Sequence, residues 1–327
     1  MHKTKILITG GCGYIGSHTV KKLIAMGEQV IVIDNLSTGS RDVLPKQAEL
    51  VVGDFADPTI LDRVFARNQI NAVIHFAASI SVPESIKYPE KYQLNNSEKS
   101  AKLWSYIVNK QVPHIIYSST AAVYGEVSSE SITEDCIPNP INPYGATKLE
   151  AECSLINSAK TSNSNYAILR YFNVAGADPA GHLGQNPEHS HHLISNCFRV
   201  VSDREGALEI FGTGYSTPDG TCVRDYIHID DLANAHIAAL AYLRGGNSSD
   251  LFNLGTGRGY SVMEIIQAVE EVTGQKIVTK LASARSGDSP RVIADSSKFQ
   301  RISSWKPIHL DIHDAIIDSW AWYSKQS

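Results

Sequence analysis

A glycine-rich turn between a short apolar segment and an amphipathic one constrains this chain more than any other feature. Residues 6–8 predict a buried parallel strand, and residues 14–26 predict a helix that stops at Gly27. The turn between them has glycines at positions 10, 13 and 16, which is G-x-x-G-x-x-G spacing. A strand, a bare turn and a helix N-terminus in this order let a pyrophosphate approach free backbone N–H groups at the positive end of the helix dipole.

An acidic residue completes the pattern one strand later. Residues 30–33 form a second apolar segment, and Asp34 follows it directly. A carboxylate at that place hydrogen-bonds the hydroxyls of an adenosine ribose and repels a 2′-phosphate, so the predicted cofactor is NAD and not NADP. Glycines also close ordinary turns, and only the strand, the helix and the acid together predict a dinucleotide site.

Strands and helices alternate through the first half of the chain. This alternation predicts an α/β fold with a Rossmann-type doubly wound parallel sheet. Beyond the first two strands, the apolar segments predict strands at 49–52, 72–76, 114–117 and 167–171. Helices are predicted at 60–66, at 88–109 and from about residue 144 onward.

The second half of the chain has a different composition. Residues 176–224 are rich in Gly, Pro, His and Asn, and Ser261 with Glu264 forms a capping box that predicts the start of a helix. Other predicted elements are a strand at 208–211, a strand at 276–281, and helices at 193–201, 295–301 and 311–324. We expect an NAD-binding Rossmann domain at 1–175, with 223–257 returning to it, and a smaller C-terminal α/β lobe that binds a UDP-sugar at 176–222 and 258–327.

Composition and charge exclude several classes of function. The 327 residues carry a net charge of −5 without a basic stretch, which argues against a nucleic-acid partner. We find no signal peptide and no apolar segment of membrane-spanning length, so we expect a cytoplasmic protein without a membrane partner. The five cysteines are scattered without a C-x-x-C pair, and the histidines at 189, 191 and 192 lack zinc-site spacing, so no metal is predicted.

A tyrosine and a lysine four residues apart are candidates for the chemistry. Tyr144 and Lys148 fall on one face of a predicted helix, where the ammonium favours the phenolate and lowers the tyrosine pKa. Such a tyrosine can take a hydroxyl proton while hydride leaves the carbon. The same spacing also arises by chance on helix surfaces. The candidate gains weight from Ser118, Ser119 and Thr120, which end a strand at the sheet edge where ligands bind, although an ordinary turn is the alternative there.

Several sequence blocks resemble the UDP-glucose 4-epimerases, a family of the extended short-chain dehydrogenase/reductases. The blocks are GGCGYIGSHT from Gly10, DNL from Asp34, AVYG from Ala122, NPYG from Asn142, LRYFN from Leu169 and RDYIH from Arg224. The resemblance implies that C4 of a UDP-sugar gives hydride to bound NAD and that the 4-keto sugar turns and receives the hydride on its other face. It also implies a homodimer that forms through the helices at 88–109 and 144–158.

The resemblance assigns roles to the matching residues of this chain. The catalytic residues would be Tyr144, Lys148 and Thr120. The cofactor would be bound by Gly10, Gly13, Tyr14, Ile15, Gly16, Asp34, Asn35, Asp54, Phe55, Phe76, Asn95, Ser118, Tyr144, Lys148 and Tyr171. The substrate would be bound by Thr120, Tyr144, Asn173, His192, Arg224, Arg285, Asp288 and Val292.

Two positions depart from the family pattern. Ile80 stands where many of these epimerases have a lysine, which predicts weaker NAD binding. Val292 stands where a large aromatic residue narrows the sugar pocket, which predicts that UDP-N-acetylglucosamine and UDP-N-acetylgalactosamine are also turned over.

Several alternatives stay open. The chain could act on another UDP-sugar, such as UDP-glucuronate or a UDP-pentose, or it could be a sugar-nucleotide or steroid dehydrogenase with exchangeable NAD. A dehydratase needs carboxylates directly after the threonine, whereas Ala121 and Ala122 follow Thr120 here. A catalytically silent NAD-binding protein would be free to lose Thr120, Tyr144 and Lys148. Trp320, Trp322 and Tyr323 are predicted to pack a helix and not to stack on a ligand.

Overall fold

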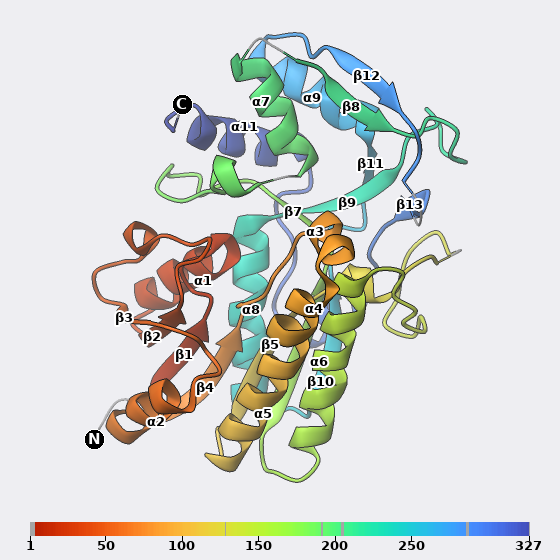
Figure 1. The fold of residues 1–327 in the computed structure, drawn as a ribbon. Helices are drawn as coiled ribbons and strands as arrows, with labels where there is room; N and C mark the ends of the chain where they lie inside the picture. The colour runs from red at the N-terminus through yellow and green to blue at the C-terminus, as the bar shows by residue number, and fades with distance from the viewer. Residues whose placement is uncertain (1–3, 128, 191, 204–205, 286–287, 327) are drawn as a thin grey trace.

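Seven parallel strands form the central sheet of this computed structural model (Figure 1). The structure describes residues 4–127, 129–190, 192–203, 206–285 and 288–326. The strand order is β10-β6-β5-β4-β1-β2-β3, and every neighbouring pair is parallel. The strands are β1 (Lys5–Thr9), β2 (Gln29–Asp34), β3 (Glu49–Val52), β4 (Ile70–His75), β5 (His114–Thr120), β6 (Asn165–Tyr171) and β10 (Asp250–Leu254). The predicted Rossmann-type doubly wound sheet is therefore confirmed.

Helices cover both faces of this sheet. Side chains alternate along a strand, so Ile6 and Ile8 pack on one face with Leu232 of α8 (Ile229–Arg244), whereas Leu7 packs on the other face with Leu103 of α5 (Lys99–Asn109). The first face is covered by α1 (Tyr14–Ala25) and α8, and the second by α2 (Pro58–Arg67), α5 and α6 (Pro143–Ala159). Burial on both faces explains why these strands are continuous apolar runs in the sequence.

The helix predicted at 88–109 is interrupted. It consists of α4 (Pro89–Tyr92), a π-helical stretch η2 (Gln93–Glu98) and α5. A π-helical turn adds one residue per turn and rotates the side chains that follow it, which periodicity alone does not reveal. A further short helix, α3 (Val82–Lys87), precedes it and is absent from the prediction.

The seventh strand, β10, is also absent from the prediction. Asn253 interrupts its apolar pattern and is fully buried. Its amide group accepts a hydrogen bond from the Tyr124 hydroxyl (2.7 Å) and donates one to the Ile132 carbonyl (2.9 Å). A buried polar residue with such partners is indistinguishable in sequence from a loop residue.

A second region lies beyond the carboxyl ends of the strands (Figure 1). The predicted capping box is confirmed, because Ser261 and Glu264 exchange hydrogen bonds at the start of α9. Trp320 packs on Phe198 and Tyr323, as predicted for a packed helix. The described residues of this region form two small sheets. One consists of β7 (Asn173–Ala175), β9 (Val223–His228), β11 (Gly259–Ser261) and β13 (Arg291–Val292), and the other consists of β8 (Leu208–Phe211) and β12 (Thr279–Ala282). Its helices are α7 (Leu193–Asp203), α9 (Val262–Thr273) and α11 (Ile312–Tyr323), whereas α10 (Ser297–Ile302) packs on β10 of the large sheet through Phe299. Short 3₁₀ helices in the described part of the chain are η1 (Arg41–Val43), η3 (Ala121–Val123) and η4 (Pro187–His189).

The segment 223–257, predicted to return to the first domain, is shared between the sheets. Its helix α8 packs on the large sheet and β10 joins that sheet, whereas β9 pairs with β7, β11 and β13. The domain boundaries at 175, 222 and 257 stay a prediction.

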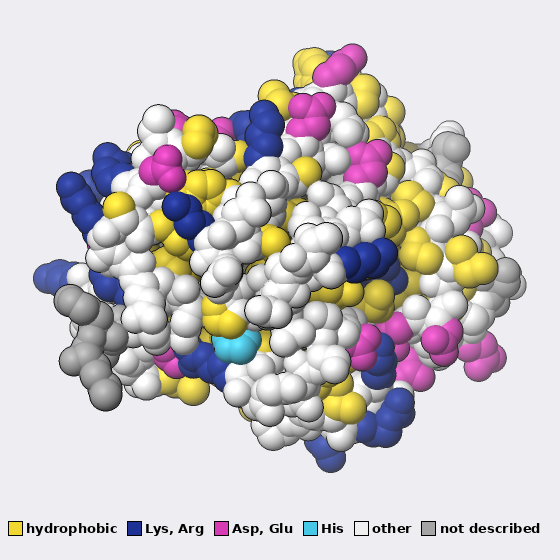
Figure 2. Space-filling view, turned by 90° about the horizontal axis from the view of Figure 1, so that it is seen from below, with side chains coloured by type: hydrophobic (Ala, Val, Ile, Leu, Met, Phe, Trp, Pro, Cys, Tyr) yellow, Lys and Arg dark blue, Asp and Glu magenta, His cyan; other side chains and the backbone are white. Residues whose placement is uncertain are grey.

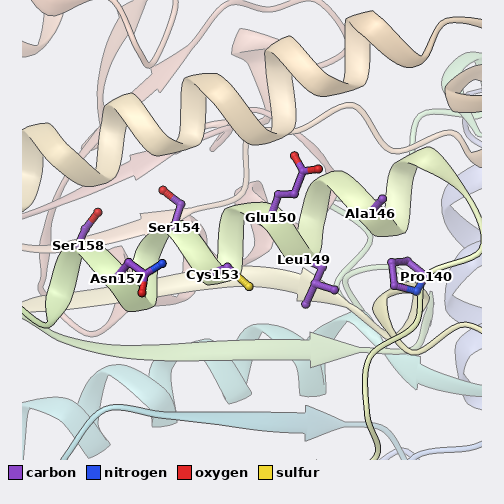
Figure 3. Close-up of a pocket in the computed structure, with 8 residues that line it drawn as sticks. All are labelled: Pro140, Ala146, Leu149, Glu150, Cys153, Ser154, Asn157 and Ser158. Carbon is purple, nitrogen blue, oxygen red and sulfur yellow. The ribbon is translucent and has the colours of Figure 1, made fainter.

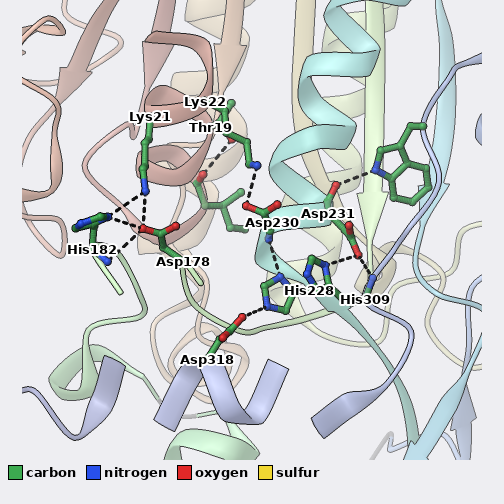
Figure 4. Close-up of polar contacts among 12 residues, drawn as sticks. Thr19, Lys21, Lys22, Asp178, His182, His228, Asp230, Asp231, His309 and Asp318 are labelled. Atoms are coloured by element: carbon green, nitrogen blue, oxygen red, sulfur yellow. Dashed lines mark hydrogen bonds and ion pairs between the residues drawn. The ribbon is translucent and has the colours of Figure 1, made fainter. Parts of the chain in front are cut away.

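Polar contacts tie the first helix to the second region (Figure 4). Lys21 of α1 forms an ion pair with Asp178 at 2.5 Å, and Lys22 forms one with Asp230 at the start of α8 at 2.7 Å. His228, at the end of β9, faces Asp318 of α11 at 3.3 Å. The two lysines lie in the C-terminal half of α1 and hold this helix against the residues that follow β7 and β9.

The opposite side of the molecule, at the amino ends of the strands, has a mixed surface. Figure 2 shows Lys and Arg side chains together with Asp and Glu side chains on this face. None of the helices within the described ranges combines the length and the apolar character that a membrane crossing needs.

Candidate active site

The glycine turn is shaped for a ligand as well as for the fold. Gly10 has φ of +73°, and a Cβ there would lie 2.5 Å from the Ala77 nitrogen. A Cβ at Gly16 would lie 2.3 Å from the Gly10 carbonyl oxygen, so both positions need glycine for packing. Gly13 differs, because the nearest protein atom to its added Cβ is 3.4 Å away. Gly13 is the N-cap of α1 without a capping side chain, which leaves a bare helix N-terminus that fits a pyrophosphate.

The Asp34 carboxylate is held at the edge of this turn. One oxygen accepts the Cys12 backbone N–H (2.9 Å) and the other accepts that of Leu36 (2.8 Å). The side chain is 9% exposed at the end of β2, and the neighbouring Asn35 is exposed. A carboxylate oxygen has two lone-pair sites, so each can still accept a ribose hydroxyl. The ribose role stays a prediction.

Several predicted cofactor residues have side chains engaged within the protein. The Tyr14 hydroxyl donates to the Gly176 carbonyl (2.5 Å), and Ile15 packs on the core. Asp54 forms an ion pair with Lys99 (2.5 Å), and the Phe55 ring packs on His75 at 4.8 Å. Because the side chains of Tyr14 and Phe55 are engaged in these contacts, these two residues would bind a cofactor through their backbone N–H groups.

The candidate catalytic residues meet where β5 ends and α6 begins. Asn142 caps α6 by accepting the Gly145 N–H (2.9 Å), and this places Tyr144 in the first turn. The Tyr144 phenol lies beside the Thr120 hydroxyl, which acts to lower the Tyr144 pKa. One turn later the Lys148 ammonium donates to the Ser118 carbonyl (2.7 Å) and lies 4.5 Å above the Tyr117 ring. The structure thus brings Thr120, Tyr144 and Lys148 together at the carboxyl edge of the sheet.

The expected depression of the Tyr144 pKa is not found in the protein alone. Burial raises the pKa of Tyr144, and only the neighbouring Thr120 hydroxyl opposes the increase. Lys148, whose ammonium donates to the Ser118 carbonyl, is not among the groups that shift the Tyr144 pKa. Burial in turn lowers the pKa of Lys148 to about 7, although the nearby Glu152 carboxylate raises it.

A second group of predicted cofactor residues lies across β5 from the catalytic helix. The Ser118 hydroxyl oxygen is 3.2 Å from the Tyr171 hydroxyl and 3.2 Å from His236 Nε2. The Phe76 ring packs on His236 with centroids 4.7 Å apart. Asn95, in the π-helical stretch, donates to the Ser79 hydroxyl (3.2 Å). Ile80, next to Ser79, is 60% exposed.

The predicted substrate residues other than Thr120, Tyr144 and Arg285 fall into two places. Arg224 donates to the Ser289 carbonyl (2.8 Å), faces Asp288 at 3.5 Å and is in register with Val292. Asn173 and His192 line a small cavity between β7, α7 and α11, together with Tyr226, Phe198 and Trp322.

Two segments remain from the sequence predictions. The loop at 285–288 is predicted to bind the substrate, and the histidines at 189–192 are predicted not to bind a metal. The Arg285 guanidinium stacks on the Phe211 ring at 3.7 Å. Ser286, Gly287 and His191 lie outside the described residues. Within the described ranges, no three His, Cys, Asp or Glu side chains are grouped to hold a metal ion.

Three buried residues next to the site were absent from the sequence prediction. Glu152 follows Lys148 by four residues on α6, and its carboxylate binds the Arg170 guanidinium of β6 at 2.5–3.2 Å. Helical spacing from Tyr144 and Lys148 could have indicated Glu152. His236 and Arg170 gave no signal, because each stands alone in an apolar segment.

Comparisons with known proteins show which proteins this chain resembles in sequence and in fold. The model of the NAD dependent epimerase/dehydratase family matches residues 6–255. A UDP-glucose 4-epimerase of Azospirillum brasilense is 45% identical over 315 residues, which cover 96% of this chain and 90% of that protein. A solved structure of a UDP-glucose 4-epimerase has a TM-score of 0.95 at 44% identity, covering 99% of this chain and 98% of that one. The UDP-Glc/GlcNAc 4-epimerase of Campylobacter jejuni has a TM-score of 0.86 at 39% identity, covering 98% and 99%.

Proposed function

The chain belongs to the NAD dependent epimerase/dehydratase family, and from this premise we propose that it is a UDP-glucose 4-epimerase. It is an isomerase that interconverts UDP-galactose and UDP-glucose with NAD as cofactor. The observation that carries the proposal is the neighbouring pair of Thr120 and Tyr144, with Lys148 one turn away, at the sheet edge beside a bare glycine turn.

The residues present fit NAD. Gly13 leaves room for a pyrophosphate, the N-terminus of α1 lacks a side-chain cap, and Asp34 is fixed beside them. Ser118 and Tyr171 lie next to Lys148, at the end where the nicotinamide would lie. When bound, NAD accepts hydride from C4 of the sugar and returns it.

The protein's own residues handle the proton. Thr120 and Tyr144 are positioned to share the 4-oxygen of the sugar, and Tyr144 takes and returns its proton. Because burial raises the Tyr144 pKa, a cation near the ring is needed before the phenol gives up its proton. Lys148 on the same helix would supply this charge together with the positively charged nicotinamide of bound NAD. Ala121 and Ala122 cannot move protons, which favours epimerisation over dehydration.

Proton NMR of the purified protein with UDP-galactose and no added cofactor tests this function. The expected result is a mixture of UDP-galactose and UDP-glucose without lasting absorbance of NADH, and loss of conversion in Tyr144→Phe. Steady NADH formation would show a dehydrogenase instead. No conversion, even with NAD supplied, would show that the substrate is another sugar nucleotide.

We further propose that UDP-N-acetylglucosamine and UDP-N-acetylgalactosamine are substrates. Val292 is small, stands beside Arg224 in register and packs on the cluster that contains Tyr124 and Phe172. The similar Campylobacter jejuni protein is described as a UDP-Glc/GlcNAc 4-epimerase. Val292→Tyr should lose conversion of the N-acetylated substrate and keep that of UDP-galactose; unchanged conversion of both would refute the role of Val292.

The assembly that we propose is a homodimer formed through α5 and α6. The outer face of α6 is hollowed into an open groove (Figure 3). The lining residues are small or apolar apart from Asn157 and Glu150, and the Glu150 carboxylate accepts a hydrogen bond from Gln93. Light scattering should give twice the chain mass, and Cys153→Arg, which places a long cation in the groove, should give the mass of one chain.

The compartment that we propose is the cytoplasm, with a UDP-sugar and no nucleic acid or membrane as partner. All five cysteines are free thiols, which suits a reducing environment.

A further inference from the structure

We propose that His236 is a positioning residue that orients the Ser118 hydroxyl toward the nicotinamide end of the cofactor. This inference rests on the proposed function, because it takes NAD as the cofactor. His236 lies on α8 and is fully buried between the Phe76 and Tyr171 rings, with centroids at 4.7 and 6.3 Å. It reaches the site through the sheet face opposite the catalytic helix.

The tautomer of His236 is fixed by its surroundings. Nδ1 lies 2.9 Å from the Leu232 carbonyl, which can only accept, so Nδ1 carries the proton. Burial lowers the pKa of His236 to about 4, and the ring is therefore neutral at pH 7. Nε2 then has a lone pair and no proton. It can act only as an acceptor.

This tautomer sets the direction of the neighbouring hydrogen bonds. The Ser118 hydroxyl has one proton and lies 3.2 Å from both Nε2 and the Tyr171 hydroxyl. Because Nε2 cannot donate, the Ser118 proton points to His236, and Tyr171 donates to Ser118. Burial raises the Tyr171 pKa, so its proton stays on.

The result is a pair of hydroxyl oxygens with free lone pairs and no proton left to donate. A carboxamide NH₂ group, with two donors, is complementary to such a pair. The nicotinamide of NAD carries this group, whereas ADP-ribose lacks it. The glycine turn and Asp34, which fit the ADP-ribose part, belong to β1, α1 and β2 and do not contact His236 in any interaction found among the described residues.

The test compares NAD with ADP-ribose. His236→Leu removes the acceptor and keeps an apolar side chain, and His236→Gln offers an amide oxygen in place of Nε2. NAD content is measured in the purified proteins, and dissociation constants for NAD and ADP-ribose are measured by calorimetry. Loss of one hydrogen bond predicts a rise of about fivefold in the NAD dissociation constant of His236→Leu. ADP-ribose binding should be unchanged, and His236→Gln should recover NAD binding.

A double-mutant cycle completes the test. In a Ser118→Ala background, His236→Leu should have no further effect on NAD binding, because its route to the cofactor is gone. Equal weakening of NAD and ADP-ribose binding would show a merely structural role and overturn the proposal, as would unchanged NAD binding in His236→Leu. Failure of the unmodified protein to bind either ligand would overturn the proposed function instead.

Discussion

Replacing Glu152 with glutamine tests whether the buried ion pair behind the catalytic helix supports the site. Glu152 and Arg170 are 1% and 3% exposed. Arg170 Nε lies 3.0 and 3.2 Å from the two carboxylate oxygens, and Nη2 lies 2.5 Å from one of them. The Ser119 hydroxyl donates to the same carboxylate. Glutamine has nearly the same shape but no charge, so it leaves the guanidinium buried without a counter-charge.

The expected cost follows from this geometry. Removing one partner of a buried ion pair costs about 3–5 kcal/mol, because the remaining charge stays desolvated. The glutamine oxygen can still accept from Arg170 and Ser119, so we expect the lower end, about 3 kcal/mol. Lys148 also loses the carboxylate that raises its pKa. The Lys148 pKa should therefore fall below its present value of about 7, and the charged form should be lost at a lower pH.

Urea denaturation of Glu152→Gln and the unmodified protein measures this cost through the shift in midpoint at constant slope. The control is Glu209→Gln, which breaks an exposed ion pair between Glu209 and Lys280 at 3.7 Å. The Glu209 side chain is 49% exposed and the Lys280 side chain is 70% exposed. That change should cost less than about 0.5 kcal/mol. A double variant, Glu152→Gln with Arg170→Met, should recover most of the lost stability. Equal stability of the Glu152 and Glu209 variants, or no recovery in the double variant, would refute the reasoning.

Three further predictions concern other parts of the site. Burial lowers the His228 pKa from 6.5 to about 3. As the pH falls, His228 therefore binds a proton in the unfolded chain before it does so in the folded protein. This favours unfolding, and the melting temperature should drop between pH 6.5 and pH 4. His228→Asn keeps an acceptor for the Asp230 N–H at the start of α8 and should reduce the drop, whereas an unchanged drop would exclude His228 as its source. Gly13→Ala should fold with a normal melting temperature, because the added Cβ has room within the protein. The purified variant should contain less extractable NAD, because the Cβ occupies the space of the pyrophosphate; normal NAD content would contradict this. Asn142→Ala should cost about 1 kcal/mol and lower kcat, because the first turn of α6 carries Tyr144, while Asn142→Asp should restore both; an effect on neither would show that the cap is dispensable.

The sequence was most informative where one local pattern decides the structure. The strand before the glycine turn, the capping box at Ser261 and the Tyr144–Lys148 spacing each need only a few neighbouring residues to be recognised. The residues that were missed depend on partners far along the chain. Glu152 is matched by Arg170 of β6, and Asn253 of β10 by Tyr124, 129 positions away. In sequence these look like isolated polar residues, and only the fold supplies their partners.

The pKa prediction for Tyr144 failed for a related reason. Helical spacing correctly places Lys148 on the same face as Tyr144, but it does not show what else binds the ammonium. In the structure the Lys148 ammonium donates to the Ser118 carbonyl at 2.7 Å, and desolvation is the largest cause of the pKa shift of each side chain. Spacing alone therefore predicts proximity better than it predicts charge.

The end of β5 explains how one strand organises both sides of the site. Side chains alternate along the strand, so Tyr117 and Ser119 contact Lys148 and Glu152 of α6, whereas the Ser118 side chain contacts His236 of α8 on the opposite face. The Ser118 carbonyl, in the plane of the sheet, binds the Lys148 ammonium. A shift of one residue in this strand would exchange the two faces and break these side-chain contacts at once. The register of β5 against β4 and β6 thus fixes the catalytic helix and the nicotinamide side relative to each other.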